Sequence, residues 1–191
     1  MPRKKDKIVS LEVIETNSTW DYRPSKILTN FICRADDAEK TIQNMDVKEY
    51  WKHERNYDNE VKAILAQPGT RNASSVFYTD EVSVEEVKLP ASVKTGTKYV
   101  YKLYNYCGEK LNTEYGTQKD MLAYISKKIK TRYVYVTYFG KCNKIEYSPK
   151  AVADILNELE KTTSQFEIEA AGRSGSTDDI IFVTPFKNCI K

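Results

Sequence analysis

The sequence predicts an α+β protein with a mostly antiparallel sheet, tandem hairpin–helix repeats and a helical N-terminal segment. One observation is an internal similarity: residues 97–130 and residues 131–161 start 34 residues apart, and each reads as strand, turn, strand and helix. The other is a change of pattern, because residues 46–67 have apolar residues at helical spacing whereas residues 76–89 alternate as strands do.

Each repeat begins with a strand rich in tyrosine and valine, residues that suit a pleated and half-buried surface. A turn follows at residues 105–109 in the first repeat and at residues 140–143 in the second. Gly108 and Gly140 can take a positive φ in these turns. When the repeats are aligned with an offset of 34 residues, five residues of the first coincide in type with five of the second. They are Thr97, Tyr99, Val100, Tyr101 and Tyr104 in the first repeat and, in the same order, Thr131, Tyr133, Val134, Tyr135 and Tyr138 in the second.

A helix closes each repeat. Thr117 and Ser148 stand where an N-cap is needed, and Pro149 suits the first helical position. Each helix has one apolar stripe, made by Met121, Leu122, Ile125 and Ile129 in the first and by Val152, Ile155, Leu156 and Leu159 in the second. Since one hairpin with one helix buries little surface, the two repeats are expected to share a sheet.

The N-terminal part is predicted to hold one strand and then helices. Alternation predicts a strand over residues 7–15, and Ser25 can cap a short helix through residues 27–32. Asp36 or Asp37 can open another helix toward residue 44, and a stronger helix over residues 46–67 ends at Pro68.

The predicted organisation is therefore an N-terminal segment at residues 1–70 and a sheet-rich region at residues 71–191. The polar residues 69–75 form a loop at the boundary. Residues 165–171 and 179–184 form a C-terminal hairpin. The whole chain is expected to pack as one compact unit.

Composition argues against several kinds of protein. Among 191 residues, 40% are apolar and 30% charged, and no apolar run reaches membrane-span length, so a cytoplasmic location is expected, in the host cytoplasm if the protein is viral. Four cysteines without C-x-x-C spacing and a single histidine provide little for a zinc site. We expect free thiols, no metal and no cofactor.

No acid–base pair poised for catalysis is visible in the sequence. His53 stands on a charged helical stretch, and nothing indicates that a cysteine reaches it. Adjacent acids such as Asp36 and Asp37 serve caps and turns more often than metals. We therefore expect a non-catalytic protein, with a small nuclease as an alternative because residues 50–60 are rich in tyrosine, arginine and glutamate.

Charge is unevenly distributed, and this gives the first functional indication. Residues 94–150 hold twelve Lys or Arg against four Asp or Glu, a net charge of +8, whereas the remaining eighteen basic and twenty-three acidic residues give −5. Basic side chains beside aromatic rings suit single-stranded nucleic acid, RNA before DNA. The candidate binding residues are Lys98, Lys102, Tyr104, Lys127, Lys128, Lys130, Arg132, Tyr133, Tyr135, Lys141 and Lys144.

A structural interpretation of the same residues stays open. Tyr99, Tyr101 and Leu103 share one face of their strand and can form the core beneath a helix. In the second repeat, Val134 and Val136 look more like core residues than the tyrosines beside them, so the repeats disagree about which face is exposed. Lysines at the end of a helix are also favoured by its dipole alone.

Over residues 76–161, the tandem sheet-plus-helix repeats with aromatic and basic strands resemble the Pur-alpha and Whirly families of single-stranded nucleic-acid binders. The resemblance implies binding of RNA or single-stranded DNA across the sheets, and dimerisation. Those families have four strands before each helix, whereas the second repeat here has two. The small size and the abundance of lysine, asparagine and tyrosine also look like those of phage or large-DNA-virus accessory proteins.

A protein-interaction or structural module is the other class to consider. An unpaired edge strand pairs readily with another chain, and the proposed sheet has at least one edge. Such a module would be a homodimer or larger homo-oligomer, a virion component or an inhibitor of a host protein.

Overall fold

The computed structural model of the protein describes residues 7–15, 26–43, 71–74, 80–107, 110–162, 165–171 and 180–190. It is α+β with a mostly antiparallel sheet, which confirms the predicted class. The chain divides into two units, residues 1–88 with 188–191, and residues 89–187. The sequence placed the division near residue 70, but β4 (Asp80–Glu86) belongs to the first unit because it pairs with β1 (Ile8–Glu15).

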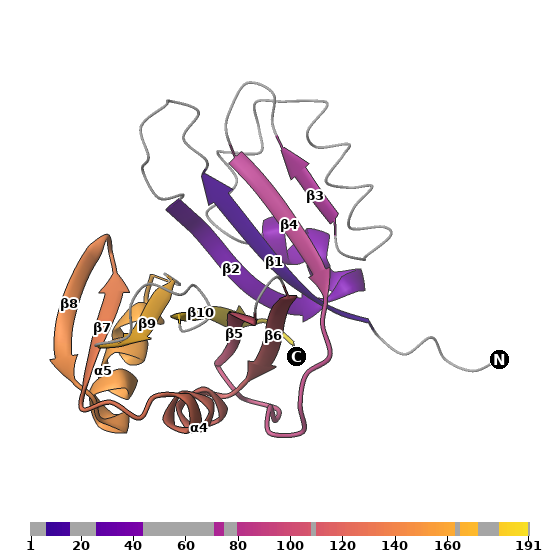
Figure 1. The fold of residues 1–191 in the computed structure, drawn as a ribbon. Coiled ribbons are helices and arrows are strands. Elements are labelled where there is room, and N and C mark those ends of the chain that lie inside the picture. The colour runs from indigo at the N-terminus through magenta and orange to yellow at the C-terminus, as the bar shows by residue number, and fades with distance from the viewer. Residues whose placement is uncertain are drawn as a thin grey trace. The chain divides into compact units, whose positions relative to one another are not determined.

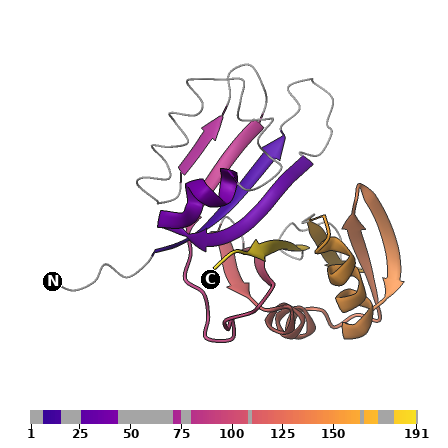
Figure 2. The same ribbon diagram turned by 180° about the vertical axis from the view of Figure 1, so that it is seen from behind.

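The first unit contains an antiparallel sheet in the order β3-β4-β1-β2, where β2 is Lys26–Arg34 and β3 is Arg71–Ser74. The strand predicted over residues 7–15 is confirmed. A short 3-10 helix, η1 (Ala35–Asp37), leads into α1 (Ala38–Gln43). This helix lies behind the sheet in Figure 1 and in front of it in Figure 2, so it covers one face.

Two predictions for this unit are wrong. Residues 27–32 form part of β2 rather than a helix, and Phe31, Ile32 and Cys33 are all buried. The apolar residues of this segment recur at helical spacing, but pairing with β1 makes the segment a strand. Part of the predicted polar loop forms β3 because it pairs with β4. The helix predicted over residues 46–67 lies outside the described residues.

The second unit has its sheet in the order β6-β5-β10-β9-β7-β8, with antiparallel neighbours. Its elements in chain order are β5 (Tyr99–Cys107), β6 (Lys110–Gly116), α4 (Gln118–Lys128), β7 (Tyr133–Tyr138), β8 (Lys141–Glu146), α5 (Pro149–Leu159), β9 (Phe166–Ala170) and β10 (Ile180–Asn188). Strands β9 and β10 lie between the hairpin β5–β6 and the hairpin β7–β8, so the hairpins are not neighbours.

The helix starts agree with the predicted caps. The Thr117 hydroxyl accepts a hydrogen bond from the Asp120 backbone N–H at 3.3 Å, and the Asp120 carboxylate accepts one from the Thr117 N–H at 2.8 Å. Partial burial opposes ionisation of Asp120, but hydrogen bonds from Ser92 and Thr117 outweigh it and lower its pKa. Ser148 caps α5 by accepting from the Ala151 N–H at 3.1 Å, and Pro149 begins that helix.

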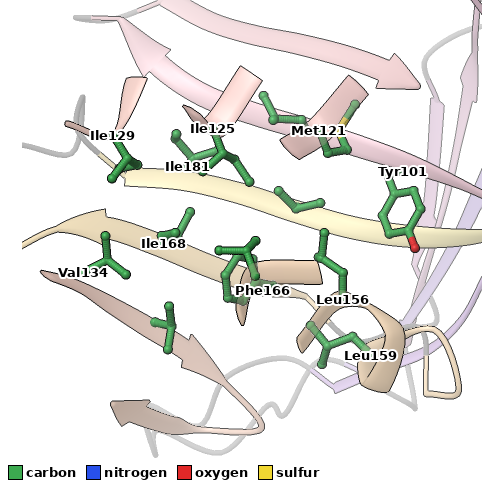
Figure 3. Close-up of a cluster of buried hydrophobic side chains, with 14 of the residues drawn as sticks. Tyr101, Met121, Ile125, Ile129, Val134, Leu156, Leu159, Phe166, Ile168 and Ile181 are labelled. Carbon is green, nitrogen blue, oxygen red and sulfur yellow. The ribbon is translucent and has the colours of Figure 1, made fainter. Parts of the chain in front are cut away.

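Helices α4 and α5 cover one face of this sheet, here called the inner face. The hydrophobic core lies between the two helices and this face (Figure 3). The buried side chains drawn there include Met121, Ile125, Leu156, Phe166, Ile168 and Ile181. Tyr101 is also buried; its hydroxyl donates to the Glu160 carboxylate and accepts from Gln118 Nε2 at 3.3 Å. Burial and the bond to Glu160 raise the pKa of Tyr101. This network joins β5 to the start of α4 and the end of α5.

Candidate nucleic-acid interface

The face of β7 that points away from the helices carries two exposed tyrosines. Val134 and Val136 are buried on the inner face, so alternation turns Tyr133 and Tyr135 to the opposite, outer face. Tyr133 is 39% exposed and Tyr135 is 40% exposed. The valines are therefore the core residues of this strand, as their pattern indicated, and the two rings are open to solvent.

Two cations lie over these rings. The Lys144 Nζ on β8 is 5.3 Å from the ring centroid of Tyr133 and 6.0 Å from that of Tyr135. The Arg132 Cζ is 5.4 Å from the Tyr133 centroid. These separations are in the range of cation–π attraction. We call Arg132, Tyr133, Tyr135 and Lys144 the β7–β8 cluster.

The β7–β8 cluster comes together because of strand pairing. Tyr135 is opposite Lys144 in the register of the two strands, and Tyr133 is opposite Glu146. The Arg132 Nε donates to the Glu146 carboxylate at 3.1 Å, an ion pair in which both side chains are largely exposed. Such a pair holds the arginine loosely and adds little stability.

Acidic side chains border the cluster on the β9 side. Glu169 is opposite Tyr135, and Glu167 is opposite Thr137, so both carboxyl groups belong to the outer face. Partial burial raises the pKa of Glu167. On the β8 side the two cations Lys144 and Arg132 outnumber the one acid, Glu146, so the positive charge of the cluster lies there, and a phosphate would be repelled from β9.

Three other predicted residues lie on strands but outside the cluster. Lys102 and Tyr104 share the outer face but stand on β5, which β10 and β9 separate from β7. Tyr104 stacks on Phe182 with ring centroids 4.7 Å apart, and Gln165 donates a hydrogen bond to its hydroxyl. Tyr138 is two residues after Val136 and so belongs to the inner face of β7. Lys141 is opposite Tyr138 and therefore belongs to the inner face of β8, whereas Lys144 belongs to the outer face.

The remaining predicted lysines belong to other parts of the second unit. Lys127, Lys128 and Lys130 lie in the last turn of α4 or just beyond it, and Lys98 is exposed before β5. The Lys130 Nζ donates to the Ser126 carbonyl at 2.9 Å, and the Lys128 Nζ is 5.8 Å from the Tyr124 ring centroid. Their position suits the negative end of the helix dipole.

One exposed aromatic residue was missed by the sequence analysis. Phe139 is 49% exposed and has a φ of 50°, next to Gly140 with a φ of 70°. Two successive positive φ values are typical of a two-residue hairpin turn that matches the strand twist. The turn thus starts one residue before the predicted segment 140–143. The sequence did not indicate a turn at Phe139, because phenylalanine is rarely found at a positive φ.

Cys33 and Cys142 are free thiols, the first buried and the second exposed, and Cys189 is half-buried. Burial, with a smaller effect of Cys189, raises the pKa of the Cys33 thiol to about 12. Among the described residues, no three His, Cys, Asp or Glu side chains gather in a way that could hold a metal ion.

Comparison of the chain with protein-family models, curated proteins and solved structures gives no match. In the part of the chain that the structure describes, no helix combines the length and apolar character required to cross a bilayer.

Proposed function

We propose that this protein binds single-stranded nucleic acid without catalysis, RNA in preference to DNA, through the β7–β8 cluster. The observation that carries this proposal is that two exposed rings and two cations share one face of one hairpin. Stacking of a base on an aromatic side chain contributes about 1–3 kcal/mol, and the cations neutralise phosphates.

The spacing of the rings favours unpaired bases. Tyr133 and Tyr135 are two residues apart on one strand, so their attachment points are about 6.7 Å apart. That is roughly twice the 3.4 Å step along a stacked nucleic-acid strand. Each ring can therefore take a separate, unstacked base, which is the form in which RNA loops and single strands are recognised.

Charge around the rings favours one path for the backbone. Lys144 and Arg132 outnumber the single acid Glu146 on the β8 side, whereas Glu167 and Glu169 lie on the β9 side. Phosphates are attracted to the first side and repelled from the second. In the proposed complex the bases cover β7, and the backbone runs along β8.

We also propose that the two hairpin–helix units are tandem repeats, as are the sheet-plus-helix units of the Pur-alpha and Whirly families that the sequence resembles. In support, α4 and α5 each have 11 residues, each follows a hairpin, and each begins at a hydroxyl cap. A cytosolic location accords with the free thiols of Cys33 and Cys142.

A pair of matched lysine variants tests the proposed interface. Lys144→Gln and Lys141→Gln remove the same charge from the same exposed strand, but from opposite faces. We expect Lys144→Gln to weaken binding of a labelled single-stranded RNA and to reduce the slope of log affinity against log salt by about 0.7. Lys141→Gln should leave both quantities nearly unchanged. Equal losses from the two variants would contradict binding at the outer face.

A further inference from the structure

Strand β8 ends the sheet of the second unit. Among the described residues it pairs with β7 alone. All of its residues are exposed except Ile145, which is half-buried. A strand of this kind offers its outer edge to another strand.

The hydrogen bonds of β8 identify the backbone groups along this edge. The Tyr147 N–H donates to the Arg132 carbonyl at 2.8 Å, so residue 147 turns its backbone groups toward β7. In an antiparallel strand the backbone groups of successive residues face opposite edges, so the N–H and C=O groups of residues 145 and 143 also face β7. The backbone N–H and C=O groups of Cys142, Lys144 and Glu146 therefore point to the open edge.

We propose that a second copy of this chain pairs antiparallel with β8, with the two-fold axis passing beside Ile145. In this register Lys144 of each copy is opposite Glu146 of the other, which gives two cross-strand charge pairs. A register centred on Lys144 or on Glu146 sets like charges opposite each other. A register centred on Asn143 pairs Lys144 with Cys142 and forms no charge pair. Charge complementarity therefore selects the register.

Packing supports the same arrangement. Ile145 and Tyr147 are half-buried side chains at the margin of the core beneath the helices. Pairing about Ile145 brings the two Ile145 residues opposite each other as a non-hydrogen-bonded pair, with Cα atoms about 4.5 Å apart. Each copy then covers the apolar margin that the other leaves partly open. An isologous contact of this kind closes as a dimer.

The dimer does not depend on the proposed nucleic-acid function. Residues opposite each other in paired strands project to the same face, so the two β7–β8 clusters would share one continuous outer face. Four exposed tyrosines would then line that face instead of two.

Cysteine cross-linking tests the register in the full chain. In a Cys142→Ser background, Ile145→Cys is expected to give a reducible covalent dimer on mild oxidation, because residues about 4.5 Å apart can form a disulfide. Asn143→Cys is the control, because it lies two residues off the axis in each copy. Cross-linking of Ile145→Cys alone supports the register, whereas cross-linking of both, of neither or of Asn143→Cys alone overturns it.

Charge reversal tests the same interface without a new thiol. Lys144→Glu or Glu146→Lys is expected to raise the dimer dissociation constant about tenfold, since each turns two opposite-charge pairs into like-charge pairs. The double variant Lys144→Glu/Glu146→Lys should return to within about threefold of the unmodified protein. Sedimentation equilibrium measures these constants. Single variants without effect, or a double variant no better than the singles, would overturn the proposal.

Discussion

The double substitution Tyr133→Ala/Tyr135→Ala is expected to weaken binding of single-stranded RNA by at least about thirtyfold. Each ring is proposed to stack one base, and each stack contributes about 1–3 kcal/mol, so the loss of both costs at least about 2 kcal/mol. The slope of affinity against salt should stay unchanged, because Arg132 and Lys144 keep their charges. Fluorescence anisotropy at several salt concentrations measures both quantities.

The matched control for this variant is Tyr133→Phe/Tyr135→Phe. It keeps both rings and removes only the hydroxyls, so binding should remain within about threefold of the original, because stacking depends on the aromatic face. Both tyrosines project away from the core, so the alanine variant should also unfold at nearly the same denaturant concentration as the original. Unchanged affinity of the alanine variant would refute the stacking role.

Phe166→Ala is expected to lower the free energy of unfolding by about 3–5 kcal/mol, the usual cost of deleting a buried phenylalanine. Phe166 is 0% exposed, on the inner face of β9 among residues of the core. The loss combines the transfer of apolar atoms with the cavity that remains. Urea titration followed by circular dichroism measures the change.

Phe139→Ala provides a matched control in the same unit, because Phe139 is 49% exposed and lies at a hairpin tip. Its substitution should change the unfolding free energy by less than about 1 kcal/mol. If the two alanine variants lost similar stability, the assignment of the inner face as the core would be wrong.

Local signals in the sequence predicted much of the second unit. Thr117 and Ser148 cap helices as predicted, because a hydroxyl in reach of an N–H three residues later is a local arrangement. Most residues of the predicted apolar stripes of α4 and α5 are buried for an equally local reason, their helical spacing, and Leu122 and Ile155 are half-buried at the margin of the core. By contrast, residues 27–32 were assigned to a helix because their apolar residues recur at helical spacing after the possible cap Ser25, and only pairing with β1 shows that they form a strand.

Which face of each tyrosine-rich strand is buried could not be decided from the internal similarity. Tyr101 and Tyr135 are equivalent in the 34-residue alignment, yet Tyr101 is buried on the inner face and Tyr135 is exposed on the outer face. A shift of one residue exchanges the two faces of a strand. The face of a strand that the helix covers is the face that is buried, and the alignment of the two repeats does not show which face the helix covers.

The composition of the candidate site was also only partly predictable. Basic and aromatic residues in one region indicated all eleven candidates, but the strand register brings only Arg132, Tyr133, Tyr135 and Lys144 together. Lys102 and Tyr104 are separated from them because β10, from the end of the chain, pairs with β5. Pairing between strands so distant in sequence leaves no local signal.

The most direct test of the proposed function is a titration of the unmodified protein with single-stranded RNA, single-stranded DNA and duplex DNA at 50 mM and 200 mM salt. We expect RNA to bind most tightly, single-stranded DNA next and the duplex most weakly. Neutralisation of about two to four phosphates should lower the affinity for RNA about sevenfold to fiftyfold between the two salt concentrations. Absence of binding at 50 mM salt, or equal affinity for all three ligands, would contradict the proposal.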